Sequence, residues 1–405
     1  MSTAAGAAAT ATGDIVPRSR SEFFRRFAQG EFGSLRVLII LAFIWAIFQA
    51  SESRFLSSTN LVNLSLQIAG IGTISVGVVL VLLLGEIDLS VGIVSGLCAA
   101  VMAVLNVKHG WSPALSIVAA VAAGAAIGLF QGTVITRFGI PSFVVTLAGL
   151  LGWQGVLLWV LGDTGTINLN AQLITDIAGK FFSDVVGWIL GIIAIGSYAF
   201  TLLNSRRRRV AAGLEAPPVG VLGFRIVAVA VAVIATITVM NADRGLPLAF
   251  VILIGFVVLF SWITTRTKFG RYIYATGGNI EAARRAGIPV DKVKIAVFTL
   301  SSVMAACGGI ILASRLLAVN QSSGGSDLLL LAIAGPVIAG TSLFGGRGSV
   351  WSALLGALVI GSISNGMDLL ALPSEDKFMV TGAVLLLAVI LDAVTGSKRR
   401  QAGRV

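Results

Sequence analysis

Long apolar runs constrain the fold of this chain more than any other feature. Runs of about 17–25 residues recur between Leu35 and Val394, and each is long enough to cross the hydrocarbon core of a bilayer as a helix. A closed barrel would show apolar and polar residues in alternation instead. Only 12% of the residues are charged and the mean hydropathy is +0.96, values far from those of a soluble domain. The sequence predicts an all-α, polytopic helical membrane protein with about ten to twelve transmembrane helices.

The basic residues predict how the chain is oriented in the membrane. The net charge is +11, and most Lys and Arg residues gather in alternate loops. Because cytoplasmic loops carry the excess of Lys and Arg, we expect both termini in the cytoplasm. The division of the charges among loops argues against a nucleic-acid-binding face. The clusters lie in the N-terminal tail, at Arg137, at Arg206–Arg209 with Arg225, at Arg266–Lys294, at Arg347 and in the C-terminal tail.

Composition further divides the chain into three regions. Residues 1–34 are rich in Ala, Ser and Arg and lack the apolar core of a signal peptide, so we expect a mobile cytoplasmic tail. Residues 35–395 form the predicted transmembrane domain, in which residues 266–294 make a cytoplasmic loop, and residues 396–405 form a basic cytoplasmic tail. The two cysteines lie inside apolar runs and there is one histidine, so no disulfide framework, metal site or cofactor site is predicted.

The polar segment Thr267–Lys294, TKFGRYIYATGGNIEAARRAGIPVDKVK, predicts a short helix with both ends specified. Asn279 supplies a side-chain oxygen for the helix N-terminus, and Glu281 places a negative charge in the first turn. Gly287 is suited to end the helix and Pro289 follows it. A membrane protein seldom builds such a helix in a cytoplasmic loop without a use for it. We therefore interpret it as a docking element for a partner.

A first break in the apolar pattern is the segment GEIDLSVG at residues 85–92. Carboxylates at the level of the bilayer are costly, and irregular backbone is tolerated there only against protein or a wet cavity. Asp88 and Ser90 are both good N-cap residues for a helix restarting at about Leu89. The break could line a polar solute path, or its acids could cap the next helix or reach the interface. The structural role is favoured for Asp88, and Glu86 is left open. The candidate residues are Gly85, Glu86, Asp88, Ser90 and Gly92.

A second break, GTSLFGGRGS at residues 340–349, has four glycines among its ten residues. Glycine permits positive φ angles and close approach of one backbone to another. A phosphate-binding loop is disfavoured because the chain contains no Walker motif. Paired interruptions near the two ends of a transporter point to its translocation path. Arg347 is expected to anchor a cytoplasmic span end, facing water or lipid phosphate. The candidate path residues are Thr341, Gly345, Gly346 and Gly348.

A third break is the polar loop Leu161–Asp184, which the charge pattern places outside the cell. It could meet a soluble partner or a sugar, or it could be a plain connecting loop. The sequence leaves the two interpretations equally open.

These segments together resemble the permease subunits of bacterial ABC importers for monosaccharides. The resemblance runs from about Leu61 to Val394, and the chain is most similar to the D-xylose permeases, which share an extra pair of spans around a basic loop at residues 188–241. NADRGLP at residues 241–247 and the pair Asn365-Gly366 are also similar, whereas Pro336 is unusual for the family. The most specific motifs are EIDLSVG at 86–92, PSFVVTLAG at 141–149, the segment 267–294, and AGTSLFGGRGSVWSALLG at 339–356.

The resemblance implies an ABC importer permease fold with broken helices, in the bacterial cytoplasmic (inner) membrane and usually present as two copies. It implies a separate ATP-binding subunit, a periplasmic or extracellular sugar-binding protein, and no catalytic residue or cofactor in this chain. The cargo would be a monosaccharide, with D-xylose ahead of ribose, arabinose and galactose. A coupling helix at about Ile280–Ala286 would enter a groove of the ATP-binding subunit. The implied coupling residues are Gly278, Asn279, Glu281, Ala282, Ala283, Arg284 and Gly287.

Two other classes compete with this prediction. In an ion-coupled secondary transporter, Glu86 and Asp88 would carry protons or bind Na⁺. In a membrane enzyme, the same acids would serve as general acid and base. No set of His, Cys or metal ligands supports an enzyme, and the resemblance disfavours both alternatives.

Overall fold

The computed structural model describes residues 33–383, 386 and 390. The predicted tails, residues 1–34 and 396–405, lie outside these residues except for Gly33 and Ser34, which open helix α2 (Gly33–Ser51). Nine helices in the described part are long and apolar enough to cross a membrane, and two shorter apolar helices cover residues 37–51 and 327–338. The prediction of a polytopic, all-α membrane protein is confirmed.

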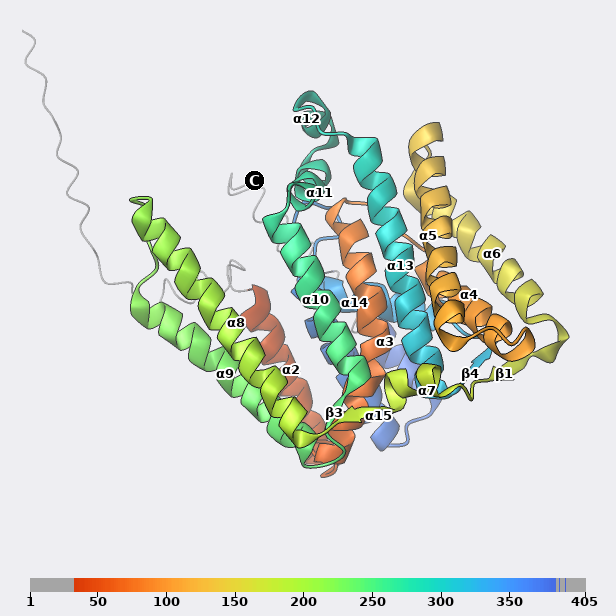
Figure 1. The fold of residues 1–405 in the computed structure, drawn as a ribbon, viewed down its shortest axis with the longest axis horizontal. Coiled ribbons are helices and arrows are strands. Elements are labelled where there is room, and N and C mark those ends of the chain that lie inside the picture. Colours follow the sequence, from red (N-terminus) through yellow and green to blue (C-terminus); the bar gives the residue numbers. More distant parts are fainter. Residues whose placement is uncertain (1–32, 384–385, 387–389, 391–405) are drawn as a thin grey trace, which may run out of the picture.

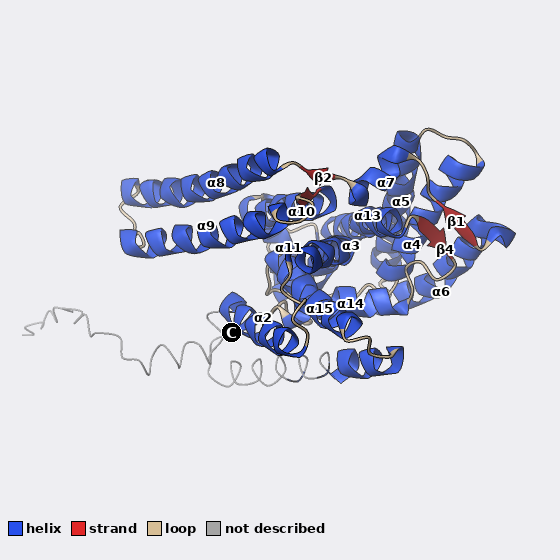
Figure 2. Ribbon diagram, turned by 90° about the horizontal axis from the view of Figure 1, so that it is seen from below, coloured by secondary structure: helices blue, strands red, loops and turns tan. Residues whose placement is uncertain are grey.

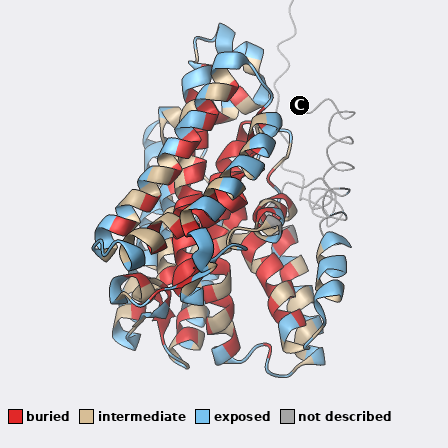
Figure 3. Ribbon diagram, turned by 90° about the vertical axis from the view of Figure 1, so that its right-hand side faces the viewer, coloured by how far each residue is buried: buried red, intermediate tan, exposed pale blue. Residues whose placement is uncertain are grey.

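Two helices form the centre of the molecule (Figure 1). Helix α3 (Ser58–Leu83) is buried along most of its length, and α13 (Val290–Leu316) packs against it and against α4 (Val91–Ala103) and α5 (Pro113–Phe138). A Cβ atom at Gly77 of α3 would lie 2.8 Å from the carbonyl oxygen of Ser301 on α13. The two backbones can approach this closely because glycine has no side chain. Buried residues concentrate in this central group, as Figure 3 shows.

The remaining helices surround this centre. Helix α15 packs on α3, α14 and α2, while α10 packs on α3 and leads into the short helices α11 and α12 at one end of the molecule (Figure 1). A π-helical turn, Val104–Lys108, extends α4. The bounds are α6 (Ser142–Leu161), α7 (Gln172–Gly179), α8 (Asp184–Ala211), α9 (Val219–Asn241), α10 (Leu248–Arg266), α11 (Lys268–Gly278), α12 (Ile280–Arg285), α14 (Ser326–Ile338) and α15 (Trp351–Leu369).

Helices α8 and α9 form a pair that stands apart from the bundle (Figure 2). They correspond to the extra pair of spans expected at residues 188–241, and they pack mainly on each other. The basic run Arg206–Arg209 was expected in the loop between them, but it forms the end of α8, which continues to Ala211. Arginine is a good helix former, so the helix extends past its apolar part.

The turn between α9 and α10 holds this pair against the bundle. Arg244 donates hydrogen bonds to Asp243 and to Asn63 of α3, and its guanidinium lies 4.7 Å from the centre of the Phe181 ring. Thr59 of α3 also donates to Asp243, at 2.9 Å. The hydrogen bond from Arg244 lowers the pKa of the Asp243 carboxyl below its ordinary value. The segment NADRGLP at 241–247 therefore has a structural role.

Two small antiparallel strand pairs lie at the end of the molecule opposite α12 (Figure 1). Strand β1 (Thr166–Asn168) pairs with β4 (Ala318–Asn320), and β2 (Phe181–Phe182) pairs with β3 (Leu246–Pro247). Strands β1 and β2 and helix α7 belong to the polar loop Leu161–Asp184, as does a 3₁₀ turn at Gly162–Thr164. That loop is thus folded onto the strand that follows α13 and is more than a flexible connection.

Pro336 lies in the last turn of α14. A proline lacks the N–H that would bond the carbonyl four residues earlier, here that of Ala332. The buried hydroxyl of Ser75 on α3 donates to the Ala332 carbonyl oxygen at 3.0 Å. Ser75 therefore satisfies the acceptor that the unusual proline leaves free.

This pairing predicts that Ser75→Ala lowers the free energy of unfolding by about 1–3 kcal/mol, because a buried carbonyl loses its donor. The double variant Ser75→Ala/Pro336→Ala should be more stable than Ser75→Ala alone, since the alanine N–H restores the missing donor within α14. Thermal unfolding of the purified variants in detergent measures both effects. Additive losses in the double variant would contradict the assigned role of Ser75.

Candidate functional site

Helix α12 has the ends that the sequence predicts. The side-chain oxygen of Asn279 accepts a hydrogen bond from the Ala282 N–H at 2.9 Å, so the N-cap is confirmed. Gly287 has a φ of +77°, and the N–H groups of Gly287 and Ile288 bond the carbonyl oxygens of Arg284 and Ala283. The helix ends at Arg285, one residue before the expected Ala286, and it lies at the tip of the molecule (Figure 1).

The surface of α12 is available to another protein. Of the seven predicted coupling residues, Ala283 alone is buried, packed toward the molecule's own core, so it anchors the helix instead of facing a partner. Arg284 also forms an exposed ion pair with Asp291 at the start of α13, at 3.4 Å. The exposed members are Gly278, Asn279, Glu281, Ala282, Arg284 and Gly287.

The structure brings together the two glycine-containing breaks, which are far apart in the sequence. The N–H of Gly346 donates to the carbonyl oxygen of Leu83 at the end of α3, at 2.9 Å. A Cβ atom at Gly345 would lie 2.7 Å from both the Gly277 carbonyl oxygen and the Gly85 nitrogen. Three backbones therefore meet with no room for side chains. We call Gly85, Gly277, Gly345 and Gly346 the glycine junction.

Side chains reinforce the glycine junction around its edge. The Tyr274 hydroxyl of α11 donates to the Gly348 carbonyl oxygen at 2.9 Å. Thr341, which is buried, shares a hydrogen bond of 2.6 Å with the hydroxyl of Ser352 on α15. These contacts fix the loop 340–349 between α11 and α15. Gly277 and Tyr274 were not among the predicted site residues, although the pair Gly277-Gly278 marks the end of α11 in the sequence.

Glu86, whose role the sequence leaves open, forms an ion pair with Lys294 of α13. The two side chains are 14% and 15% exposed, so water has limited access to either charge. Lys294 lies in the first two turns of the helix that follows α12. The pair therefore connects the first break directly to the segment that carries α12.

Asp88 is buried and holds the start of α4. One of its carboxylate oxygens accepts from the Ser90 N–H at 2.9 Å and from the Ser90 hydroxyl at 2.7 Å, and Gln131 of α5 donates to the same hydroxyl at 2.9 Å. Helix α4 begins at Val91, two residues later than predicted, because this turn precedes it. The geometry matches the structural interpretation of Asp88.

The backbone of the first break is satisfied by hydroxyl groups of α6. The N–H groups of Ile87 and Leu89 donate to Ser142 and Thr146, at 3.2 and 3.0 Å. Both hydroxyl residues are buried, and both belong to the motif PSFVVTLAG at 141–149. Irregular backbone inside a membrane protein requires such partners. The motif thus supplies hydrogen-bond acceptors for the irregular backbone of the first break.

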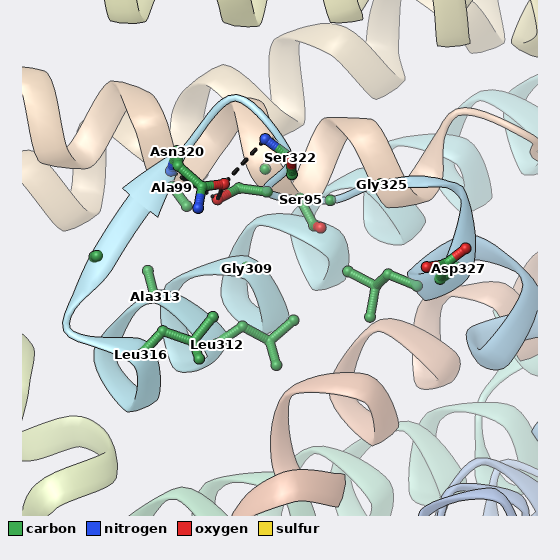
Figure 4. A pocket seen from close by; sticks show the side chains of 15 residues that line it. Ser95, Ala99, Gly309, Leu312, Ala313, Leu316, Asn320, Ser322, Gly325 and Asp327 are labelled. Atoms are coloured by element: carbon green, nitrogen blue, oxygen red, sulfur yellow. Dashed lines mark hydrogen bonds between the residues drawn. The ribbon is translucent and has the colours of Figure 1, made fainter. Parts of the chain in front are cut away.

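A cavity of about 370 Å³ lies between α4, the second half of α13 and the loop at residues 320–325 (Figure 4). The loop enters closely among the helices: a Cβ atom at Gly96 of α4 would lie 1.9 Å from the Ser323 carbonyl oxygen. The sequence analysis missed this site. The sequence feature that could have indicated this site is the polar run NQSSGGSD at 320–327, which separates two apolar segments.

The first break reaches from the glycine junction to this cavity. Gly85 belongs to the junction, whereas a Cβ atom at Gly92 would lie 3.0 Å from the carbonyl oxygen of Gly324 in the cavity loop. Residues 85–92 therefore touch both the glycine junction and the loop that lines the cavity. Among the residues that the structure describes, no group of three or more His, Cys, Asp or Glu residues is placed to hold a metal ion.

Comparisons with known proteins agree with this architecture. Residues 60–389 match the family model described as branched-chain amino acid transport system / permease component. The xylose transport system permease protein of Escherichia coli is 38% identical over 364 residues, which cover 90% of this chain and 91% of the relative. The corresponding protein of Haemophilus influenzae is 37% identical over 365 residues, covering 90% and 96%.

A ribose import permease protein of Escherichia coli is 31% identical over 369 residues, covering 91% of this chain and 96% of the relative. No solved structure matches the chain. The family description mentions amino acids, whereas these relatives are named for sugars. The family match therefore indicates a permease but does not identify the transported solute.

Proposed function

We propose that this chain, which belongs to the family of branched-chain amino acid transport system permease components, is the membrane-spanning permease subunit of an ATP-driven importer of D-xylose. The observation that carries the proposal is the exposed, capped helix α12 together with the contacts of its flanking helices. Helix α11 meets the end of α3, next to the first break, through Gly277, and α13 contacts the first break itself through Lys294. An ATP-driven permease needs such a connection between its docking helix and the membrane-spanning part. A docking helix without these contacts would not provide it.

The transport subunit performs no covalent chemistry and moves its solute by alternating access. ATP binding by a separate subunit displaces α12, and α11 and α13 move with it. The glycine junction and the Glu86–Lys294 ion pair transmit this motion to residues 85–92 and to the start of α4. The partner must therefore bind the two arrangements of this region with different affinities.

The assembly that we propose contains two copies of this chain in the bacterial inner membrane, with both termini in the cytoplasm. Each α12 enters a groove of an ATP-binding subunit, and a sugar-binding protein delivers the monosaccharide from the opposite side. Helices α8 and α9 and the exposed apolar side chains of α6 face lipid or the second copy.

D-xylose is favoured as the solute because the similarity to xylose permeases exceeds that to ribose permeases over the same share of the chain. Ribose is the second candidate. Uptake of radiolabelled D-xylose into vesicles containing the permease, the ATP-binding subunit and the sugar-binding protein tests the proposal, with ribose as competitor. Uptake driven by an ion gradient without the ATP-binding subunit would instead establish a secondary transporter.

The coupling role of α12 predicts that Gly287→Val uncouples transport. Open space surrounds the position where a Cβ atom would stand, but its φ of +77° strains a β-branched residue by about 1 kcal/mol or more. Insertion and folding should persist while ATP-driven uptake falls about tenfold. Gly287→Asn is the matched control, since asparagine tolerates this conformation, and it should retain most uptake. Normal uptake and stimulated ATP hydrolysis in Gly287→Val would refute the coupling role.

A further inference from the structure

We propose that the cavity between α4, α13 and the loop 320–325 binds one monosaccharide ring on its way through the permease. The inference rests on the proposed function, because it assigns that function's solute a place in this chain. The lining residues used below are Leu312 and Leu316 of α13, Ala318 of β4, Asn320 and Ser322 of the loop, and Asp327 of α14.

The size and the two-sided chemistry of the cavity fit a sugar ring. Its volume of about 370 Å³ lies at the lower end of the range for small-molecule sites, roughly 300–1,000 Å³, and suits a single ring. Figure 4 shows Asn320 and Ser322 of the loop across the hollow from Leu312 and Leu316. A pyranose presents hydroxyl groups around its edge and C–H groups on its faces. Its edge can therefore bond the loop while one face lies on the leucines.

Asn320 is positioned to donate to a hydroxyl group. Its side-chain oxygen accepts from the Ser322 N–H at 2.9 Å, which fixes the amide plane (Figure 4). Within the described residues, its Nδ2 group has no hydrogen-bond partner, although the other end of the amide is held. A fixed donor with spare capacity at the edge of a cavity is the kind of group that orients a small polar ligand.

The lining favours weak binding, as passage through a transporter requires. The lining residues, all within the described part of the chain, include no aromatic side chain on which a sugar could stack, and Asp327 is the single ionisable residue among them. A site that binds too tightly would hold its solute and slow release. We therefore expect half-saturation in the millimolar range, roughly 1–100 mM.

The position of the cavity explains how ATP could act on it. Its loop touches α4 at Gly92 and Gly96 through backbone contacts that leave no room for a side chain. Helix α4 follows the first break, which reaches the glycine junction and the Glu86–Lys294 pair. A shift of α4 must therefore move the loop and change the shape of the cavity.

Protection from chemical labelling tests occupancy directly. Ser322→Cys in a Cys307→Ala background, with Cys98 buried, should react with a water-soluble maleimide. Adding 100 mM D-xylose should slow this reaction at least about twofold, as a site half-saturated at or below roughly 100 mM demands. His109→Cys, exposed on a turn beyond α4, is the matched control and should show no protection. Equimolar maltotriose, whose three rings exceed a cavity sized for a single ring, should protect neither cysteine. Equal labelling rates of Ser322→Cys with and without D-xylose would overturn the inference.

Filling the cavity gives an independent test in the complete importer. Ala318→Leu places three more carbon atoms in the cavity, and we expect at least a tenfold loss of D-xylose uptake at equal membrane abundance. His109→Leu should import normally. If the wild-type importer does not import D-xylose, the proposed function fails. If it does, and Ala318→Leu imports equally well, the cavity is not the binding site although the function stands.

Discussion

Replacing Gly346 with leucine is expected to reduce sugar uptake at least a hundredfold at equal abundance in the membrane. Gly346 has a φ of +69°, and a Cβ atom there would lie 2.9 Å from the Cα atom of Gly278. The backbone cannot relax freely, because the Gly346 N–H bonds the Leu83 carbonyl oxygen. A leucine therefore combines conformational strain with a backbone clash and forces the second break away from α3 and α11.

The neighbouring substitution Arg347→Lys is the control for a general effect of altering this loop. Arg347 is exposed and its side chain has no hydrogen-bond or ion-pair partner among the described residues, as expected for an anchor facing water or lipid phosphate. Lysine keeps the positive charge, so uptake should stay close to wild type. Full activity in Gly346→Leu, or complete loss in Arg347→Lys, would show that the two roles are reversed.

A pair of adjacent glycines sharpens this test. A Cβ atom at Gly277 would lie 1.9 Å from the Leu83 carbonyl oxygen, whereas a Cβ atom at Gly278 meets no atom within 4 Å. One added methyl group should therefore impair uptake in Gly277→Ala and be tolerated in Gly278→Ala. Equal effects in the two variants would mean that the glycine junction is not the sensitive contact.

Local features of the sequence predicted local structure well. Apolar runs fixed the helical membrane architecture, and the caps of α12 followed from Asn279 and Gly287, whose interactions reach only a few residues along the chain. Boundaries were less certain: α4 begins at Val91 because Asp88 and Ser90 form a turn first. The end of α8 was misplaced because a run of arginines is compatible with both helix and loop.

Contacts between distant segments could not be predicted in the same way. The glycines of both breaks allowed close backbone approach, but no local signal indicated that Gly346 would bond Leu83. The cavity loop was missed because Asn320 and its polar neighbours resemble an external connection in sequence, whereas in the structure they fold back onto α4. Pairing of Glu86 with Lys294 likewise depends on the packing of α13 against α3 and α4.

Breaking the ion pair between Glu86 and Lys294 is expected to lower uptake about tenfold. Each single variant, Glu86→Gln or Lys294→Gln, leaves the other charge in a site with little access to water, at a cost of roughly 1–3 kcal/mol, between the values for exposed and buried pairs. The damage should appear as weaker stimulation of ATP hydrolysis by the sugar-loaded binding protein, because the first break is no longer joined to α13.

The double variant Glu86→Gln/Lys294→Gln separates this role from proton or ion coupling. It leaves neither charge unpaired, and two glutamines can hydrogen-bond each other, so we expect uptake above that of either single variant. A glutamate that carried protons would behave differently: Glu86→Gln would abolish uptake, and a change at Lys294 could not restore it. Measuring ATP-driven uptake in the four proteins of this cycle decides between the roles. Simple additivity of the two losses would rule out the pair as the link between α13 and the first break, because linked residues must show a coupling energy.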